Sequence, residues 1–245
     1  MLLTGRYSIL KVPPKDVALL PKLFVGALLS ACAATFIAGP AAAQIRQNDA
    51  RAGNTLDLFY KLDADWTLAV SSKVLFDRNF SRWNDVQFRP NVIYSFSPEW
   101  SAGVGYVQFQ PVQSTSRTQR GAFQDVFYRT NFGRLSVSNR LRVNETFADQ
   151  SSALRIFSSY ALSLRHPIGE SDWFALLADE PVFNLKVDGT GRQAGFLLNR
   201  TTLGIGRPIV PGMVATLKYE LSETNVQGSN YLQHTFLLGL DIRFN

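Results

Sequence analysis

The stretch Tyr231–Phe244, with the sequence YLQHTFLLGLDIRF, alternates apolar and polar residues with a period of two. Successive side chains of a β-strand point to opposite faces of the sheet, so this period predicts a strand with one apolar and one mainly polar face. The stretch before it, 213–221, repeats the pattern, with Leu217 and Tyr219 on the apolar face and Lys218 and Glu220 on the other. The end of the chain therefore predicts a pair of amphipathic strands.

The same alternation recurs upstream, and after Gly53 no segment keeps helical periodicity. Further strands are predicted near residues 56–62, 66–76, 85–96, 100–110, 122–132, 135–143, 154–165, 173–184 and 195–206. This count gives eleven strands in all. Bacterial outer-membrane barrels have even counts, so we expect ten or twelve, and Gln44–Arg51 is the segment that could supply a twelfth.

The connections between these strands alternate in length. Short turns are predicted at 63–65, 97–99, 133–134, 169–172 and 210–212, and longer polar loops at Asp77–Asn84, Pro111–Gly121, Ala148–Ser152, Lys186–Ala194 and Ser222–Asn230. Short turns on one side and longer loops on the other are typical of outer-membrane barrels, in which the short side is periplasmic. Trp66, Trp100, Trp173 and Tyr231 stand near strand ends, where an outer-membrane barrel carries interfacial aromatics.

Composition agrees with β-structure in contact with lipid. Aromatic residues make up 12% and charged residues 18% of the 245 residues. Lipid offers backbone groups no hydrogen-bond partner, so a sheet that spans a membrane must close on itself. The sequence therefore predicts an all-β fold, an antiparallel transmembrane β-barrel of about 10–12 strands over residues 44–245. The alternative is a soluble periplasmic β-barrel or sandwich, in which the apolar face would point inward.

The first 43 residues have the order of a secretory signal peptide: a basic start, an apolar run from Leu23 to Ile37, and Ala41–Ala43 as cleavage site. Cleavage after Ala43 predicts export and a bacterial outer-membrane location. The tetrad Leu29-Ser30-Ala31-Cys32 resembles a lipoprotein box, which leaves lipidation of Cys32 as the alternative.

Removing this leader lowers the formal net charge from +6 to +3, because it takes four bases and one acid. The basic balance is therefore poor support for nucleic-acid binding. Cys32 is the only cysteine, so a processed chain would have no thiol, disulfide or thiolate metal site. With His166 and His234 as the only histidines, we expect no metal and no cofactor.

Charged residues gather at the positions predicted to face inward. The candidates are Arg89, Arg129, Arg140, Arg142, Arg155, Arg165, Arg200, Lys218 and Arg243, with Asp125, Glu180, Glu220 and Asp241, and also Lys73, Asp57 and Asp85. One interpretation is a salt-bridged polar filling of a narrow lumen, because buried charges persist only when they are paired. The other is a small pore with an arginine-lined wall, which would prefer anions.

Signals for an enzyme are weak. His234 is predicted to face lipid, where outer-membrane lipid deacylases place a His-x-Ser pair, but position 236 is Phe. Asp179 and Glu180 are adjacent, so on a strand they would point to opposite faces and could not act as a carboxylate pair. We therefore expect a structural barrel or a narrow channel, and a lipid-modifying enzyme remains the alternative.

The outward positions Phe236, Leu238, Leu240, Ile242 and Phe244 resemble the C-terminal signal read by barrel-assembly machinery, except that the aromatic residue is penultimate and Asn245 is last. The expected partners are that machinery and outer-membrane lipids. The sequence does not predict an oligomeric state.

Several motifs occur in a fixed order from Phe123 to Phe244: Arg140-Leu141-Arg142 with Glu145 and Phe147, Leu154-Arg155 through His166-Pro167-Ile168, Asp179-Glu180 with Val182-Phe183, and Asn199-Arg200 with Leu203-Gly204-Ile205-Gly206. In this order they resemble the uncharacterised outer-membrane family called domain of unknown function 2490. The resemblance implies a signal peptide and an outer-membrane barrel. It implies no catalytic residues, because the family has no assigned activity to carry over.

Overall fold

The computed structural model describes residues 45–77, 82–112, 118–148, 154–187, 194–226 and 229–244. The predicted leader 1–43, including Cys32, lies outside these ranges. Strands make up nearly all of the described chain: β1 (Ile45–Lys61), β2 (Trp66–Asp77), β3 (Arg82–Ser95), β4 (Trp100–Pro111), β5 (Gln119–Phe132), β6 (Leu135–Ala148), β7 (Leu154–Pro167), β8 (Phe174–Val187), β9 (Gly195–Val210), β10 (Met213–Val226) and β11 (Ser229–Phe244).

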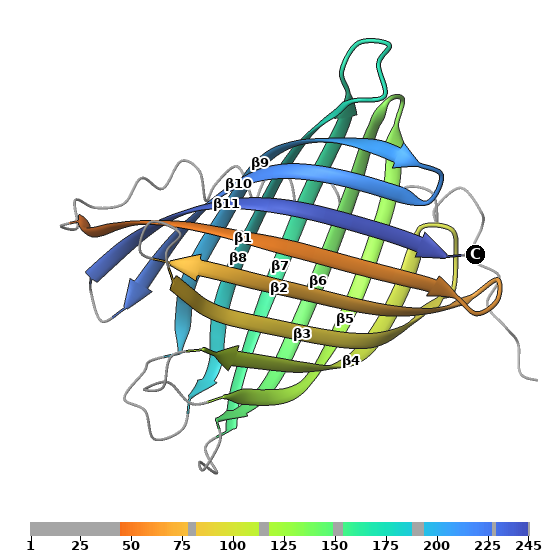
Figure 1. Cartoon of the computed structure of the whole chain (residues 1–245). Coiled ribbons are helices and arrows are strands. Elements are labelled where there is room, and N and C mark those ends of the chain that lie inside the picture. Colours follow the sequence, from red (N-terminus) through yellow and green to blue (C-terminus); the bar gives the residue numbers. More distant parts are fainter. Residues whose placement is uncertain are drawn as a thin grey trace, which may run out of the picture. The chain divides into compact units, whose positions relative to one another are not determined.

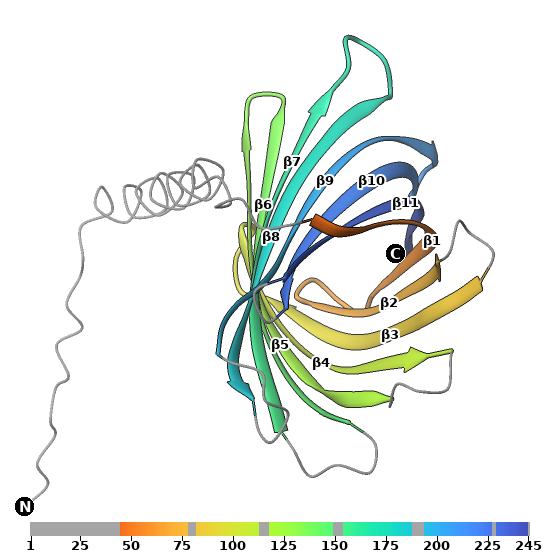
Figure 2. The same cartoon turned by 90° about the vertical axis from the view of Figure 1, so that its left-hand side faces the viewer.

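The strands form one closed barrel in which each strand pairs with its neighbours along the chain and β1 pairs with β11. Figure 1 shows β1 lying between β11 and β2, and Figure 2 shows the sheet curling back on itself. The predicted closed β-barrel is confirmed. The expectation of an even, fully antiparallel barrel is wrong, because the described residues form eleven strands and β1 runs parallel to β11.

The odd count dictates the parallel closure. Consecutive strands alternate in direction, so the first and eleventh strands of such a series point the same way. Gln44–Arg51 was the segment expected to supply a twelfth strand, but β1 begins at Ile45 and includes most of it. The predicted loop Ser222–Asn230 is mostly strand, because β10 continues to Val226 and β11 starts at Ser229.

The barrel has two distinguishable ends. We call "turn end" the one where the short connections 62–65, 96–99, 133–134, 168–173 and 211–212 lie, and "loop end" the opposite one. At the turn end, the Asp63 carboxylate accepts hydrogen bonds from the backbone N–H groups of Trp66 and Asp65, both at 2.8 Å. These bonds lower the pKa of Asp63 because they stabilise its charged form.

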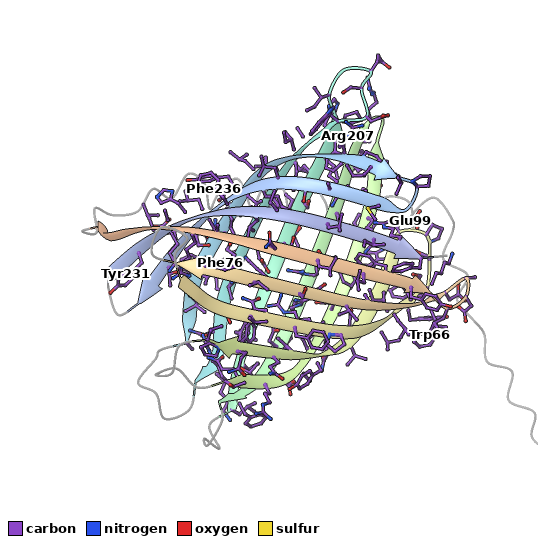
Figure 3. All side chains as sticks on the ribbon, viewed as in Figure 1. Trp66, Phe76, Glu99, Arg207, Tyr231 and Phe236 are labelled. Atoms are coloured by element: carbon purple, nitrogen blue, oxygen red, sulfur yellow. The ribbon has the colours of Figure 1, made fainter. Side chains whose placement is uncertain are left out.

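The outward face is mainly apolar. Leu238 is 61% exposed and Val104 59% exposed, and large apolar side chains are exposed on nearly every strand. Pairs of aromatic rings lie at the turn end, where Trp66 contacts Tyr94 and Trp100 contacts Tyr128, each with ring centroids 4.8 Å apart. In Figure 3, Trp66 and Tyr231 lie at opposite ends of the barrel. Among the described residues, no helix combines the length and apolarity needed to cross a membrane.

The inward face mixes charged groups with a small apolar core. Val107 and Phe123 are almost completely buried, and Ala69, Ile93 and Leu237 are also buried. Burial of these side chains stabilises the fold by about 1.5–3 kcal/mol for each large one.

One close approach between strands requires glycine. A Cβ at Gly121 of β5 would overlap the carbonyl oxygen of Glu145 on β6 and would lie 2.7 Å from the Thr146 Cα. Both are backbone atoms of the paired strand, which cannot move aside without breaking the ladder. Gly133, in the turn between the same two strands, has a φ of +59° and open space around it.

We therefore predict that Gly121→Ala lowers the free energy of unfolding by about 1–3 kcal/mol, because the added methyl group forces β5 and β6 apart. The measurement is urea unfolding of the detergent-solubilised barrel. The matched control is Gly133→Asn, since Asn adopts positive φ readily and the added side chain meets nothing. Equal stability of Gly121→Ala and the native chain would refute the close approach.

Candidate functional site

Two cavities lie inside the barrel. The first, of about 580 Å³, is lined near the turn end by Pro98, Thr130 and Asn131, and we call it the turn-end cavity. The second, of about 700 Å³, is lined near the loop end by Pro111 and Gln119, and we call it the loop-end cavity. Both volumes are within the usual range of about 300–1,000 Å³ for small-molecule sites.

Three arginines line both cavities and therefore stand at the boundary between them. Arg89 comes from β3, and Arg140 and Arg142 come from β6. Arg140 and Arg142 share the inward face because they are two positions apart on one strand. We call Arg89, Arg140 and Arg142 the central arginine cluster.

Two members of this cluster are tightly paired. Arg142 on β6 binds Asp125 on β5 through two hydrogen bonds, Nε–Oδ1 at 2.7 Å and Nη2–Oδ2 at 2.6 Å. The Asp125 side chain is fully buried and that of Arg142 is 9% exposed. Arg140 Nη2 lies 2.7 Å from Glu180 Oε1. The bidentate, buried geometry of the Arg142–Asp125 pair is typical of strong charge-assisted hydrogen bonding, whereas Arg140 and Glu180 make a single contact.

Glu180 on β8 also joins the cluster to β9. Its second oxygen, Oε2, accepts a hydrogen bond of 3.1 Å from Arg200 Nη1, so one carboxylate bridges two guanidinium groups. On the other side of the lumen, Lys73 Nζ of β2 lies 3.1 Å from Glu220 Oε1 of β10. Ion pairs that cross several strands therefore hold predicted inward candidates together: Glu180 with Arg140 and Arg200, and Glu220 with Lys73.

Arg89 differs from its neighbours. Within the described ranges no carboxylate forms an ion pair with it, and its Nε is buried without a hydrogen-bond partner. Its guanidinium instead lies over the Phe109 ring of β4, with Cζ 5.2 Å from the ring centroid. Stacking on an aromatic face stabilises the charge while leaving the N–H groups at the edge of the guanidinium plane available for an acceptor.

A second charged group lines the turn-end cavity: Arg129, Arg165 and Arg243, with Asp57 and Asp241. Asp57 and Asp241 are direct register partners across the β1–β11 seam. Arg165 Nη2 lies 3.9 Å from Asp241 Oδ2, so this pair is loose. Arg165, near Asp241, and Lys218 and Arg89, near Asp57, offset part of the repulsion between the two carboxylates.

The remaining predicted lumen residues have different surroundings. Arg155 lines the loop-end cavity and donates a hydrogen bond of 3.3 Å to Asn184 Oδ1. Asp85 lines the same cavity and accepts a hydrogen bond of 3.1 Å from Gln87. Lys218 lines neither cavity. The predicted assembly-signal positions Phe236, Leu238 and Phe244 are 49%, 61% and 49% exposed, and Leu240 and Ile242 share their outward parity.

Sequence reasoning missed the phenylalanines that hold the arginines. Six inward arginines lie over phenylalanine rings at 4.3–5.6 Å, in the pairs Arg89–Phe109, Arg129–Phe127, Arg142–Phe123, Arg155–Phe157, Arg165–Phe174 and Arg243–Phe59. A signal was present for two of them, because Phe127 and Phe157 stand two positions from their arginine on the same strand. The other four pairs depend on the register between strands.

The carboxylates of Asp179 and Glu180 do not form a pair, as their adjacent positions on one strand predict. Asp179 accepts hydrogen bonds from Asn199 and Thr201, whereas its neighbour Glu180 binds Arg140 and Arg200, so the two carboxylates face opposite sides of β8. His234 Nδ1 lies 2.6 Å from the Tyr219 hydroxyl oxygen. The described residues contain no group of three or more His, Cys, Asp or Glu side chains that could hold a metal ion.

The buried Arg142–Asp125 pair yields a stability prediction. Arg142→Met should lower the free energy of unfolding by about 3–5 kcal/mol, because it leaves the Asp125 carboxylate buried without its partner. The double variant Arg142→Met/Asp125→Leu should recover most of this loss, since it removes both charges. Urea unfolding in detergent measures all three proteins.

The exposed pair Arg134–Glu170 provides the control, because its side chains are 50% and 94% exposed. Arg134→Met should change the free energy of unfolding by less than about 1 kcal/mol. A double variant no more stable than Arg142→Met alone would contradict the explanation that the loss comes from an unpaired, buried Asp125 carboxylate.

Comparison with known proteins found one family. No curated protein and no solved structure matches the chain. A family model described as "Protein of unknown function (DUF2490)" matches residues 54–233. This confirms the resemblance predicted from the motifs of the C-terminal half and extends it to β1 through β5. The matched region covers most of the barrel, and the chain therefore belongs to the DUF2490 family of proteins of unknown function.

Proposed function

We propose that this protein is a non-enzymatic β-barrel of the bacterial outer membrane, and that its lumen is a narrow passage that prefers anions. The proposal has two parts, the membrane location and the anion preference. Different features of the barrel support them.

The outward face supports the membrane location. Large exposed apolar side chains such as Leu203 (54%), Leu217 (51%) and Leu238 (61%) cover it. In water, a contiguous apolar surface of this kind is costly, whereas in hydrocarbon it is favourable. The strands have 12–17 residues, which is more than the roughly 9–11 that a tilted strand needs to cross a bilayer. The aromatic pairs at the turn end fit one membrane interface.

The orientation follows from the connections and from the last strand. The connections at the turn end have two to six residues, and three of the five at the loop end, 112–118, 149–153 and 188–194, have five to seven, so the turn end suits the periplasmic side. Phe236, Leu238 and Phe244 are exposed along β11, as recognition by barrel-assembly machinery would require. Outer-membrane lipids are the partners proposed for the remaining apolar face.

The observation that carries the anion preference is the surplus of arginine around the lumen. Eight arginines line the two cavities (Arg89, Arg129, Arg140, Arg142, Arg155, Arg165, Arg200 and Arg243), whereas the carboxylates that line them are Asp57, Asp85, Asp125, Glu180 and Asp241. A constriction lined by cationic side chains lowers the energy of an anion and raises that of a cation. The central arginine cluster is the part of the lumen where both effects would be largest.

The location is tested by fractionation. The processed protein should be found in the outer-membrane fraction, should need detergent for extraction, and should migrate differently on gels before and after heating, because a closed barrel resists unfolding by detergent at room temperature. A protein that stays monomeric in buffer without detergent would contradict the membrane location.

The anion preference is tested in planar bilayers under a salt gradient. The native barrel should give small conductance steps and a reversal potential of the sign expected for chloride over potassium. Arg200→Gln should shift the reversal potential towards zero, because it removes one lumen charge and leaves Glu180 less compensated.

Arg207→Gln serves as the matched control. Arg207 is exposed and its guanidinium lies over Trp173, away from both cavities. Its removal changes the net charge equally and should leave the reversal potential unchanged. A native barrel that inserts but never conducts would show that the lumen is a structural polar filling, the other interpretation of the same charges.

A further inference from the structure

Basic side chains outnumber acidic ones in the described lining of the loop-end cavity. Arg89, Arg140, Arg142, Arg155 and Arg200 line it, against Asp85 and Glu180. Asp125 neutralises Arg142 from the turn-end side. Arg140 and Arg200 share the single carboxylate of Glu180, and no carboxylate among the described residues forms an ion pair with Arg89. Buried charges are stable only when compensated, so a cavity with this arrangement favours an anion.

Arg89 is the group best placed to meet such an anion. It has no ion-pair partner among the described residues, and its guanidinium is held against Phe109. Neighbouring Arg140 binds Glu180 through Nη2 alone in the hydrogen bonds of the described residues. Two guanidinium groups at the floor of one cavity thus have donors that the ion pairs do not use. Guanidinium groups match the oxygens of phosphate in a planar, two-pronged geometry.

Part of the cavity wall is apolar. Phe109, Phe157, Val182, Leu197 and Leu198 contribute to it, and Pro111 lies towards the loop end. A bare inorganic ion would leave this wall in contact with water. A ligand with a compact anionic head and an apolar body would bury the wall and compensate the arginines at once.

We propose that the loop-end cavity is a binding site for small organic phosphates, with the dianionic phosphoryl group on Arg89 and Arg140 and the apolar body against Phe157, Val182 and Leu198. The two guanidinium groups of Arg89 and Arg140 favour a phosphate monoester over a carboxylate, because the monoester carries close to two negative charges at neutral pH. This inference deepens the proposed function, since the site would lie in the same passage.

The experiment uses the full barrel purified in a non-ionic detergent and phenyl phosphate as the probe, with isothermal titration calorimetry as the measurement. Inorganic phosphate tests the head alone, benzoate tests a monoanion, and benzyl alcohol tests the apolar body alone. Phenyl phosphate should bind at least about tenfold more tightly than each of the three, because only this probe satisfies both the charge and the apolar wall.

Arg89→Gln should weaken phenyl phosphate binding by about tenfold or more, since it removes a charge-assisted contact to the phosphoryl group. Arg89→Lys should recover part of the affinity, because it restores the charge without the planar donors. Lys218→Gln is the matched control: it removes one charge from a residue on β10 that lines neither cavity, and it should leave the affinity within about twofold. Unchanged heat-dependent gel mobility establishes that each variant is folded.

Three results would overturn the proposal. Equal weakening by Arg89→Gln and Lys218→Gln would mean that overall charge, and not a site, attracts the probe. Equal affinity for phenyl phosphate and inorganic phosphate would remove the role of the apolar wall. Binding of benzyl alcohol as tight as that of phenyl phosphate would remove the role of the arginines.

The planar-bilayer measurement distinguishes the proposed phosphate-binding site from the proposed anion-conducting passage. Phenyl phosphate binding that is lost in Arg89→Gln, in a barrel that does not conduct, would keep the site and reject the passage. Anion-selective conductance without preferential binding of phenyl phosphate would keep the passage and reject the site.

Discussion

The parallel ladder between β1 and β11 is the interaction on which the rest of the barrel depends, because it alone converts a series of hairpins into a closed sheet. Its register joins Asp57 to Asp241 and Leu58 to Ile242, so inward residues continue into inward residues and outward residues into outward residues across the seam. Without this pairing, two long strands would expose unpaired backbone groups, and the charges of β1 and β11 would not face a common interior. Closure therefore creates the lumen as well as the sheet.

The strands and their faces could be predicted from the sequence because a period of two is a local property. The alternation located the eleven strands, and Arg140, Arg142 and Glu180, which parity assigns to the inward face, line the cavities. The even strand count was wrong because it rests on the habit of antiparallel closure, whereas backbone groups are satisfied equally by a parallel pair. The early part of β1 carries no alternation, so nothing local indicated that it pairs with β11.

The partners of the lumen charges could not be predicted, because they depend on the stagger of the strands and on distances across the interior. Arg140 on β6 reaches Glu180 on β8, and Lys73 on β2 reaches Glu220 on β10. Neither pair follows from sequence spacing. The absence of a described ion-pair partner for Arg89 is likewise a property of the closed barrel, since carboxylates are present on several strands and only closure decides which arginines they serve.

The stacking of arginine on phenylalanine explains how the lumen keeps its two cavities open. A long charged side chain left free would extend across the interior and pair with any carboxylate opposite. Here the guanidinium of Arg89 is held over Phe109 on the next strand, and that of Arg243 over Phe59, so both lie along the wall. Lysine would replace them only in part, because its compact ammonium group is strongly hydrated and lacks a plane that stacks. The preference for arginine is thus explained by the need to hold positive charge at the wall while leaving two cavities between.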